Sequence, residues 1–184
     1  MPQSFHSPSQ GPLSLEEVIA AVTHYMAEIP NATYEVLVGS DSQAYHLGQS
    51  SAGSGAESHE AGETDFVSVV VVHRVGRGAR YFWKKTKKER YLGIREKIYE
   101  EATLSLMLAM EMGGKLKDYF QHNGAAFAES GEPSYKLEIH VDIGANGPTR
   151  EMIKEIVGMI RGNGFVVRTK PAAYAASIVA DKHT

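Results

Sequence analysis

The sequence predicts a single α/β domain with a mixed five-stranded sheet and helices on both faces of that sheet. Short runs rich in β-branched residues alternate with longer stretches of helical periodicity, in the order β-β-β-α-β-α-β-α after an extra N-terminal helix. Three consecutive strands imply an antiparallel part of the sheet, and the two later strand–helix units imply a parallel part. The 184 residues, 42% of them hydrophobic, suffice for one core.

Composition excludes several classes of protein. The chain has no cysteine, which excludes disulfides and thiolate metal sites and fits the reducing cytoplasm, where we expect the protein to act. No apolar stretch approaches the length of a membrane-spanning helix, and the N-terminal residues lack the pattern of a secretory signal. The patterns of a P-loop ATPase and of an α/β-hydrolase nucleophile are also absent from the sequence.

The N-terminal region divides into a tail and the start of the domain. Residues 1–12 are rich in Ser, Pro and Gln and predict a disordered tail. The single domain, 13–184, opens with a helix. Ser14 and Glu17 have the spacing of a capping box at its start, and Pro30 ends it.

Three strands follow this helix. The first is Tyr34–Ser42, and a Gly/Ser-rich stretch over 44–63 then predicts a flexible insertion loop. Because this loop follows the first strand directly, it is a candidate lid. The second strand, Phe66–Val75, and the third, Ala79–Lys85, are joined by the turn Gly76–Gly78 and are expected to pair as a hairpin.

The rest of the chain alternates between helices and strands. The expected elements are a long helix over 92–120 with a break at Gly113 and Gly114, a polar loop over 123–133, a strand over 135–144, a helix from Pro148 to Arg161, a strand over 165–169 and a final helix over 172–181.

Carboxylates end two of the apolar strands. Asp41 ends the first strand and Asp142 the fourth, and Asp181 follows near the C-terminus. Ligands of open α/β sheets bind outside the carboxyl ends of the parallel strands, where the strand order reverses. A buried carboxylate is costly unless it is neutralised, and hard divalent cations do this through oxygen ligands. The pattern predicts an acidic Mg²⁺ or Mn²⁺ site of the kind used in phosphoryl transfer.

Four short runs carry a family resemblance. Residues 38–43 (VGSDSQ), 95–98 (REKI), 140–144 (HVDIG) and 170–177 (KPAAYAAS) resemble the bacterial YkuK-type family of uncharacterised RNase H-like proteins. The resemblance covers roughly residues 13–184. It implies an RNase H-like fold and, by likeness to ribonuclease H, a metal-dependent nuclease.

The resemblance also implies four metal-binding catalytic carboxylates. Asp41 matches the aspartate of the first strand, Asp142 the one that ends the fourth strand, and Asp181 the last acidic residue. Three glutamates near the start of the long helix could supply the fourth carboxylate: Glu96, Glu100 and Glu101. Glu101 shares the inward helix face and is preferred, with Glu96 second. In a two-metal mechanism one ion activates water and the other stabilises the leaving oxygen, with Asp41 bridging them.

Five basic residues and one histidine are further candidates for the functional site. The densest basic cluster consists of Lys84, Lys85, Lys87, Lys88 and Arg90. It predicts contacts to nucleic-acid phosphates, and the alternative is an edge strand protected by lysines against aggregation. His140 shares a strand face with Asp142 and could orient it, although a satisfied half-buried histidine is the more common case.

Two functions stay open from the sequence. The first is a Mg²⁺- or Mn²⁺-dependent nuclease, for which RNA, an RNA–DNA hybrid and structured DNA would all be suitable substrates. A dimer with two sites a fixed distance apart would favour a DNA junction. The alternative is a non-catalytic nucleic-acid-binding or scaffold domain that retains the fold without turnover.

Overall fold

The fold is built on one mixed sheet with the strand order β3-β2-β1-β4-β5. The computed structural model describes residues 4–46, 62–89, 92–123, 131–144 and 150–184. The strands are β1 (Thr33–His46), β2 (Gly62–Arg74), β3 (Ala79–Lys88), β4 (Ser134–His140) and β5 (Val166–Arg168). The first three pair antiparallel, and β4 and β5 join parallel beside β1. This confirms the predicted mixed five-stranded sheet.

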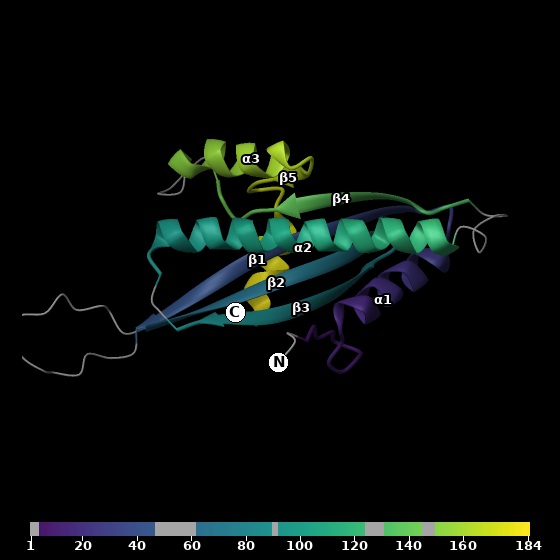
Figure 1. Ribbon diagram of the computed structural model, residues 1–184, viewed down its shortest axis with the longest axis horizontal. Helices are drawn as coiled ribbons and strands as arrows, with labels where there is room; N and C mark the ends of the chain where they lie inside the picture. The colour runs from purple at the N-terminus through teal and green to yellow at the C-terminus, as the bar shows by residue number, and fades with distance from the viewer. Residues whose placement is uncertain (1–3, 47–61, 90–91, 124–130, 145–149) are drawn as a thin grey trace, which may run out of the picture.

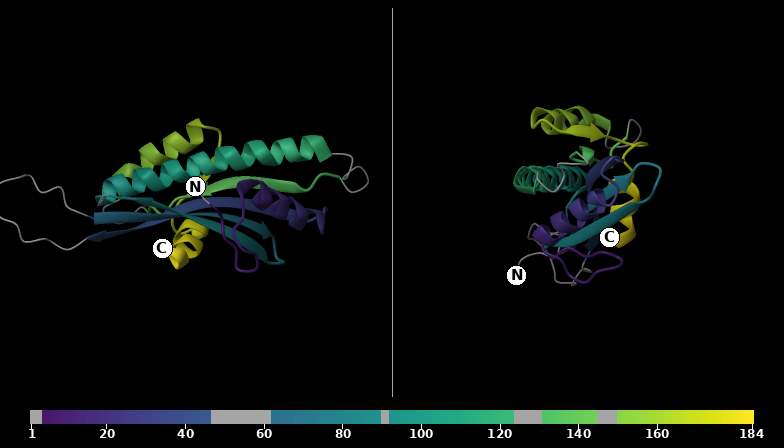
Figure 2. Two further views of the ribbon diagram at one scale, coloured as in Figure 1. Left: turned by 60° about the horizontal axis from the view of Figure 1, so that its bottom comes forward. Right: turned by 90° about the vertical axis from the view of Figure 1, so that its right-hand side faces the viewer.

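Helices cover both faces of the sheet, as Figures 1 and 2 show. One face carries α1 (Leu15–Ala27), α2 (Ile94–Asn123) and α3 (Ile153–Gly162), which follows the short 3₁₀ turn η2 (Arg150–Met152). The opposite face carries the C-terminal segment, which is the π-helical η3 (Ala175–Ala180) followed by the 3₁₀ turn η4 (Asp181–His183). The predicted final helix over 172–181 is therefore a π-helical segment that begins at Ala175 and continues as a 3₁₀ turn. No helix in these described segments is long and apolar enough to cross a membrane.

The alternation of β1 divides the core between the two faces. Val36 and Val38 are fully buried in the large cluster beneath α1, α2 and α3. Leu37 points the other way and packs with Val67 and Val69 against η3. Because successive side chains of a strand point to opposite faces, Asp41 shares the η3 face with Leu37, whereas Ser42 shares the α2 face with Val38.

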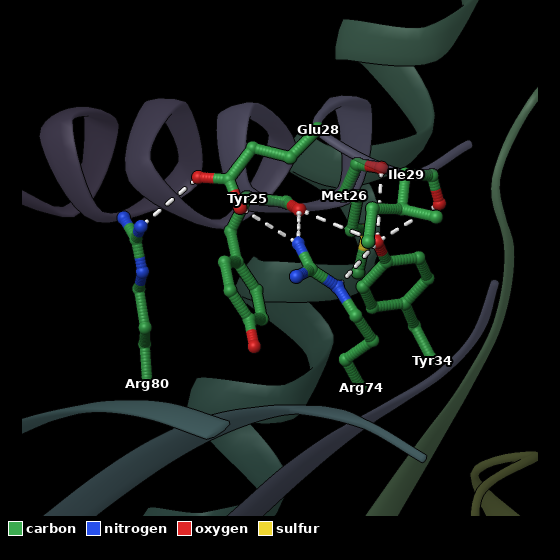
Figure 3. A network of polar contacts seen from close by, with 7 residues as sticks. All are labelled: Tyr25, Met26, Glu28, Ile29, Tyr34, Arg74 and Arg80. Carbon is green, nitrogen blue, oxygen red and sulfur yellow. Dashed lines mark hydrogen bonds and ion pairs between the residues drawn. The ribbon is translucent and has the colours of Figure 1, made fainter. Parts of the chain in front are cut away.

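A buried arginine anchors the end of α1 on the sheet (Figure 3). The Arg74 guanidinium donates to the Tyr34 hydroxyl at 3.0 Å, the Tyr25 carbonyl at 2.6 Å and the Glu28 carboxylate at 2.8 Å. Arg80 reaches the other oxygen of Glu28 at 3.0 Å. A cation is favourable at a helix C-terminus, where carbonyl groups lack helical partners. The network therefore fixes the N-terminal helix against β2.

The start of α1 agrees with the sequence. The Ser14 hydroxyl accepts from the Glu17 backbone N–H at 3.2 Å, and the Glu17 carboxylate accepts from the Ser14 N–H at 2.7 Å. This reciprocal pair is the predicted capping box.

The N-terminal segment departs from the expected disordered tail. Phe5 is 2% exposed, and its backbone exchanges two hydrogen bonds with Leu13. His6 exchanges two more with Trp83 on β3. The expectation of disorder therefore does not hold for the described residues 4–12. An apolar side chain buried at the sheet edge outweighs the polar composition, and the segment covers an edge that would otherwise be open.

Helix α2 is continuous, so the predicted break at Gly113 and Gly114 is wrong. Gly113 instead permits a close approach, since a Cβ there would lie 3.2 Å from Cδ2 of Leu137 on β4. Two glycines can remain helical where tertiary packing supports the helix.

The predicted 44–63 loop is shorter than expected, because β1 continues through His46 and β2 begins at Gly62. The rest of that loop, and the helix start predicted at Pro148, lie outside the described residues. The fourth strand ends at His140, earlier than the predicted residue 144.

Candidate active site

The parallel pairing of β1 and β4 places Asp41 beside Asp142. Leu37 lies opposite Glu138, and Gly39 lies opposite His140. The same offset, continued two residues past the last pair, brings Asp142 level with Asp41 on the η3 face. On its other side, Asp41 remains paired with Val67 of β2.

The environment of Asp41 favours its neutral form. Burial, with smaller contributions from the carboxylates of Asp142 and Asp181, raises the pKa of this carboxyl to about 6. A backbone hydrogen bond from Ser42 and the charge of Lys97 act in the opposite direction on this pKa. Like charges and desolvation both disfavour a carboxylate, so a cation bound beside Asp41 would lower this pKa toward its usual value.

Glu101 enters the site from the opposite face of the sheet. Its side chain points inward from α2 and is 9% exposed, and Oε1 accepts a hydrogen bond from the Ser42 hydroxyl at 2.5 Å. Burial raises the pKa of Glu101 to about 8, and nearby Asp41 contributes to the increase. Glu96, the second choice, is exposed and accepts from the Gly93 N–H at 3.2 Å. The geometry therefore favours Glu101 over Glu96.

A lysine contacts Asp142. The Lys170 ammonium lies 2.8 Å from Asp142 Oδ1, and this buried oxygen has no directional hydrogen bond in the described part of the chain. The Lys170 backbone N–H donates to the Ile143 carbonyl at 2.9 Å, which holds the lysine beside the loop after β4. The ion pair with Asp142 raises the pKa of Lys170, and the charges of Asp41 and Asp181 do the same.

Asp181 is the most exposed of the four carboxylates. It opens η4 and influences the pKa of Asp41 through space. Two residues later the His183 ring stacks on Trp83 with centroids 3.9 Å apart. This stacking holds the C-terminal turn against β3 and keeps Asp181 near the other carboxylates.

His140 contributes to the site by positioning the backbone of η3. It is 2% exposed, and its Nδ1 accepts from the Ala175 backbone N–H at 3.1 Å. Burial lowers the pKa of His140 to about 4, so the ring is neutral and carries its proton on Nε2 at neutral pH. The hydrogen bond of this ring therefore fixes the start of η3.

The basic cluster is partly neutralised within the fold. Lys87 forms an ion pair with Glu63, and Lys88 forms one with Glu100 at 2.7 Å. Lys84 lies 5.2 Å from the ring centroid of Phe5, and burial lowers the pKa of its amino group.

The remaining two residues of the basic cluster are Lys85 and Arg90. Lys85 is exposed on the η3 face, where its charge lowers the pKa of His183, although burial of that ring has the larger effect. Arg90 lies outside the described residues.

The donor set is of the type that binds a hard cation. Four carboxylates from four chain segments supply only oxygen, and two of them have pKa values raised by burial and by mutual repulsion. Within the described ranges, however, no three His, Asp or Glu side chains converge closely enough to hold one ion. The residues fit a divalent cation in chemistry, and Lys170 supplies the positive charge nearest to Asp142.

Sequence reasoning missed two residues of this site. Ser42 follows Asp41 directly, and strand alternation alone shows that it points to the opposite face of the sheet from Asp41. Lys170 follows β5, and the carboxyl ends of parallel strands lie at the same edge of a sheet. Extending that rule from β4 to β5 would have placed this lysine at the site.

Comparison with known proteins agrees with this architecture. The chain is 26% identical over 182 residues to "Uncharacterized protein YkuK" of Bacillus subtilis (strain 168), covering 98% of this chain and 96% of that protein. No solved structure matches the chain. The family described as Ribonuclease H-like matches residues 17–184. The resemblance predicted from the sequence is confirmed, and the chain belongs to the ribonuclease H-like family.

Proposed function

We propose that the protein is a metal-dependent nuclease that hydrolyses phosphodiester bonds of RNA, of an RNA–DNA hybrid or of structured DNA. The observation that carries the proposal is the placement of carboxylates from separate segments at one sheet edge: the register of β1 and β4 brings Asp142 level with Asp41, and Glu101 accepts a hydrogen bond from Ser42, the next residue. The charges of Asp142 and Asp181 also act on the pKa of Asp41. Carboxyl groups with strongly raised pKa values are concentrated at functional sites more than elsewhere. Membership of the ribonuclease H-like family supports the same class of chemistry.

In this proposal the four carboxylates hold Mg²⁺ or Mn²⁺. When bound, the ion supplies Lewis-acid stabilisation and a more acidic water. Asp41 takes the central position, because it lies between Asp142, which follows β4, and Glu101 of α2. Ser42 holds the Glu101 carboxylate through its hydroxyl, and the stacked C-terminal turn holds Asp181.

The nucleic-acid partner is proposed from the positive charge around the site. Lys85 and Lys182 both influence the pKa of His183, so their charges lie near the C-terminal turn. Lys97 influences both Asp41 and Glu101 from α2. Phosphate backbones bind such cations with the release of counterions, so the affinity should fall as salt rises.

Two observations favour the alternative of a non-catalytic binding or scaffold domain. The ammonium of Lys170 pairs with Asp142, and no three-ligand group forms among the described residues. A site neutralised by its own lysine could bind nucleic acid without cleaving it.

Cleavage of labelled RNA, DNA, hybrid and junction substrates in Mn²⁺ tests the proposal. Asp41→Asn and Asp142→Asn should each abolish cleavage. Asp118→Asn should cleave like the wild type, because this exposed residue lies on α2 about 25 Å from Glu101 at 1.5 Å per residue. Retention of binding with no cleavage of any substrate by the wild type would support the scaffold alternative.

A further inference from the structure

We propose that Lys170 is a built-in competitor of the divalent cation, whose ammonium group holds Asp142 in the ion-free protein and is displaced when the ion binds. The inference rests on the proposed metal-dependent function and adds to it a residue that sets the affinity of the site for the ion.

The position of Lys170 is fixed by its backbone. The Val141 N–H donates to the Arg168 carbonyl at 3.0 Å, and the Lys170 N–H donates to the Ile143 carbonyl at 2.9 Å. The first bond continues the parallel pairing of β4 and β5 past His140, and the second ties Lys170 to the segment that follows Asp142. The backbone therefore holds the lysine beside Asp142 whether or not its side chain makes an ion pair.

The side chain of Lys170 is free to exchange partners. It is 52% exposed, whereas the Asp142 side chain is 21% exposed. The amino group can move into solvent on its flexible stem, while the carboxylate stays in place. Since Asp142 Oδ1 has no directional hydrogen bond within the described segments, that oxygen is available to an ion once the ammonium leaves.

The surroundings of the ammonium favour positive charge. Asp142 is its direct partner at 2.8 Å, and the charges of Asp41 and Asp181 also act on it. These are three of the four carboxylates proposed to bind the ion. An ion at Asp142 and the ammonium of Lys170 would repel each other strongly at such short range. The two cations therefore compete for the same oxygen.

The expected effect is an increase in affinity when the lysine is neutralised. A partly exposed ion pair contributes little net free energy, so we expect Lys170→Gln to bind Mn²⁺ about threefold more tightly than the wild type. A role for Lys170 in orienting Asp142 would give the opposite sign, because loss of the lysine would then weaken binding.

Mn²⁺ binding, followed by the electron paramagnetic resonance of the free ion, tests the inference without a turnover assay. Wild type, Lys170→Gln, Lys170→Arg and Asp142→Asn are compared at one ionic strength. Lys136→Gln is the matched control, since this exposed lysine lies on β4 about 20 Å from Asp142 at 3.3 Å per residue. It changes the net charge equally and should leave the affinity unchanged.

The outcomes separate this inference from the proposed function. Tighter binding by Lys170→Gln, wild-type affinity in Lys170→Arg and loss of binding in Asp142→Asn would support both. Unchanged or weaker binding by Lys170→Gln, with Asp142→Asn still defective, would overturn the competitor role and leave the metal site standing. Absence of Mn²⁺ binding in both the wild type and Lys170→Gln would overturn both.

Discussion

Replacing Glu101 with glutamine should stabilise the ion-free protein at neutral pH. The carboxyl of Glu101 is buried and has a pKa of about 8, compared with the usual glutamate value of 4.5. Below pH 4.5 both the folded and the unfolded states hold the proton, so the substitution gains nothing. Between pH 4.5 and 8 the unfolded state alone releases it, and the folded wild type loses stability as the pH rises.

The size of the effect follows from the same two pKa values. Each pH unit above 4.5 lowers the free energy of unfolding by about 1.4 kcal/mol, so the loss reaches about 3 kcal/mol at pH 7. Glutamine removes this loss and retains an oxygen that can accept the hydrogen bond from Ser42. Glu101→Gln should therefore exceed the wild type by about 3 kcal/mol at pH 7 and by less than about 0.5 kcal/mol at pH 4.5.

Urea unfolding in a chelator, repeated from pH 4.5 to 8, measures this difference. Glu111→Gln on the exposed side of α2 is the control and should stay within about 0.5 kcal/mol of the wild type throughout. Equal stability of wild type and Glu101→Gln at pH 7 would refute the reasoning. So would a difference between them that is independent of pH, because burial would then not be what holds the proton on Glu101.

Three further predictions concern stability, and urea unfolding measures each of them. Arg74→Met should cost about 2 kcal/mol because its guanidinium is buried among three acceptors, whereas Arg80→Met on the same glutamate should cost less than about 1 kcal/mol. Equal costs would contradict the anchoring role of Arg74. Gly114→Ala should stabilise α2 by about 1 kcal/mol, since its Cβ would meet open space. Gly113→Ala should gain less, because its Cβ would press on β4, and the reverse order would disprove the close approach. Phe5→Ala should cost about 3 kcal/mol, as expected for a fully buried ring. No loss of stability in Phe5→Ala would show that the N-terminal segment is not part of the core.

Much of the fold could be predicted because hydrophobic periodicity and pairing rules are local. The β-branched run of β2, the hairpin turn into β3 and the capping box of α1 each carry their signal within a few residues. The N-terminal segment could not be predicted in this way. Its order depends on Phe5 and on the unpaired edge of β3, more than 70 residues away in the chain. The composition of this segment describes its average polarity and does not reveal that a single side chain, Phe5, anchors it in the core.

In the candidate site too, some residues could be predicted from local sequence, whereas others depend on long-range packing. Asp41 and Asp142 follow from strand ends, which are local features, and Glu101 follows from the face of a helix. The pairing of Lys170 with Asp142 and of Ser42 with Glu101 depends on how β5 and α2 pack on the sheet. The internal neutralisation of the basic cluster, such as Lys88 by Glu100, likewise arises only once β3 lies beside α2.

Both ends of the chain meet at Trp83, and this gives the protein an optical reporter. It is the only tryptophan in the chain. His6 exchanges backbone hydrogen bonds with it, and the ring of His183 stacks on its indole. The emission of a single indole will therefore respond when either chain end detaches, without any label. Asp181 lies two residues before His183, so an ion that binds Asp181 should change the emission of Trp83 in the folded protein. In a urea titration, the C-terminal turn should detach from Trp83, and change its emission, at a lower concentration than the one that unfolds the sheet.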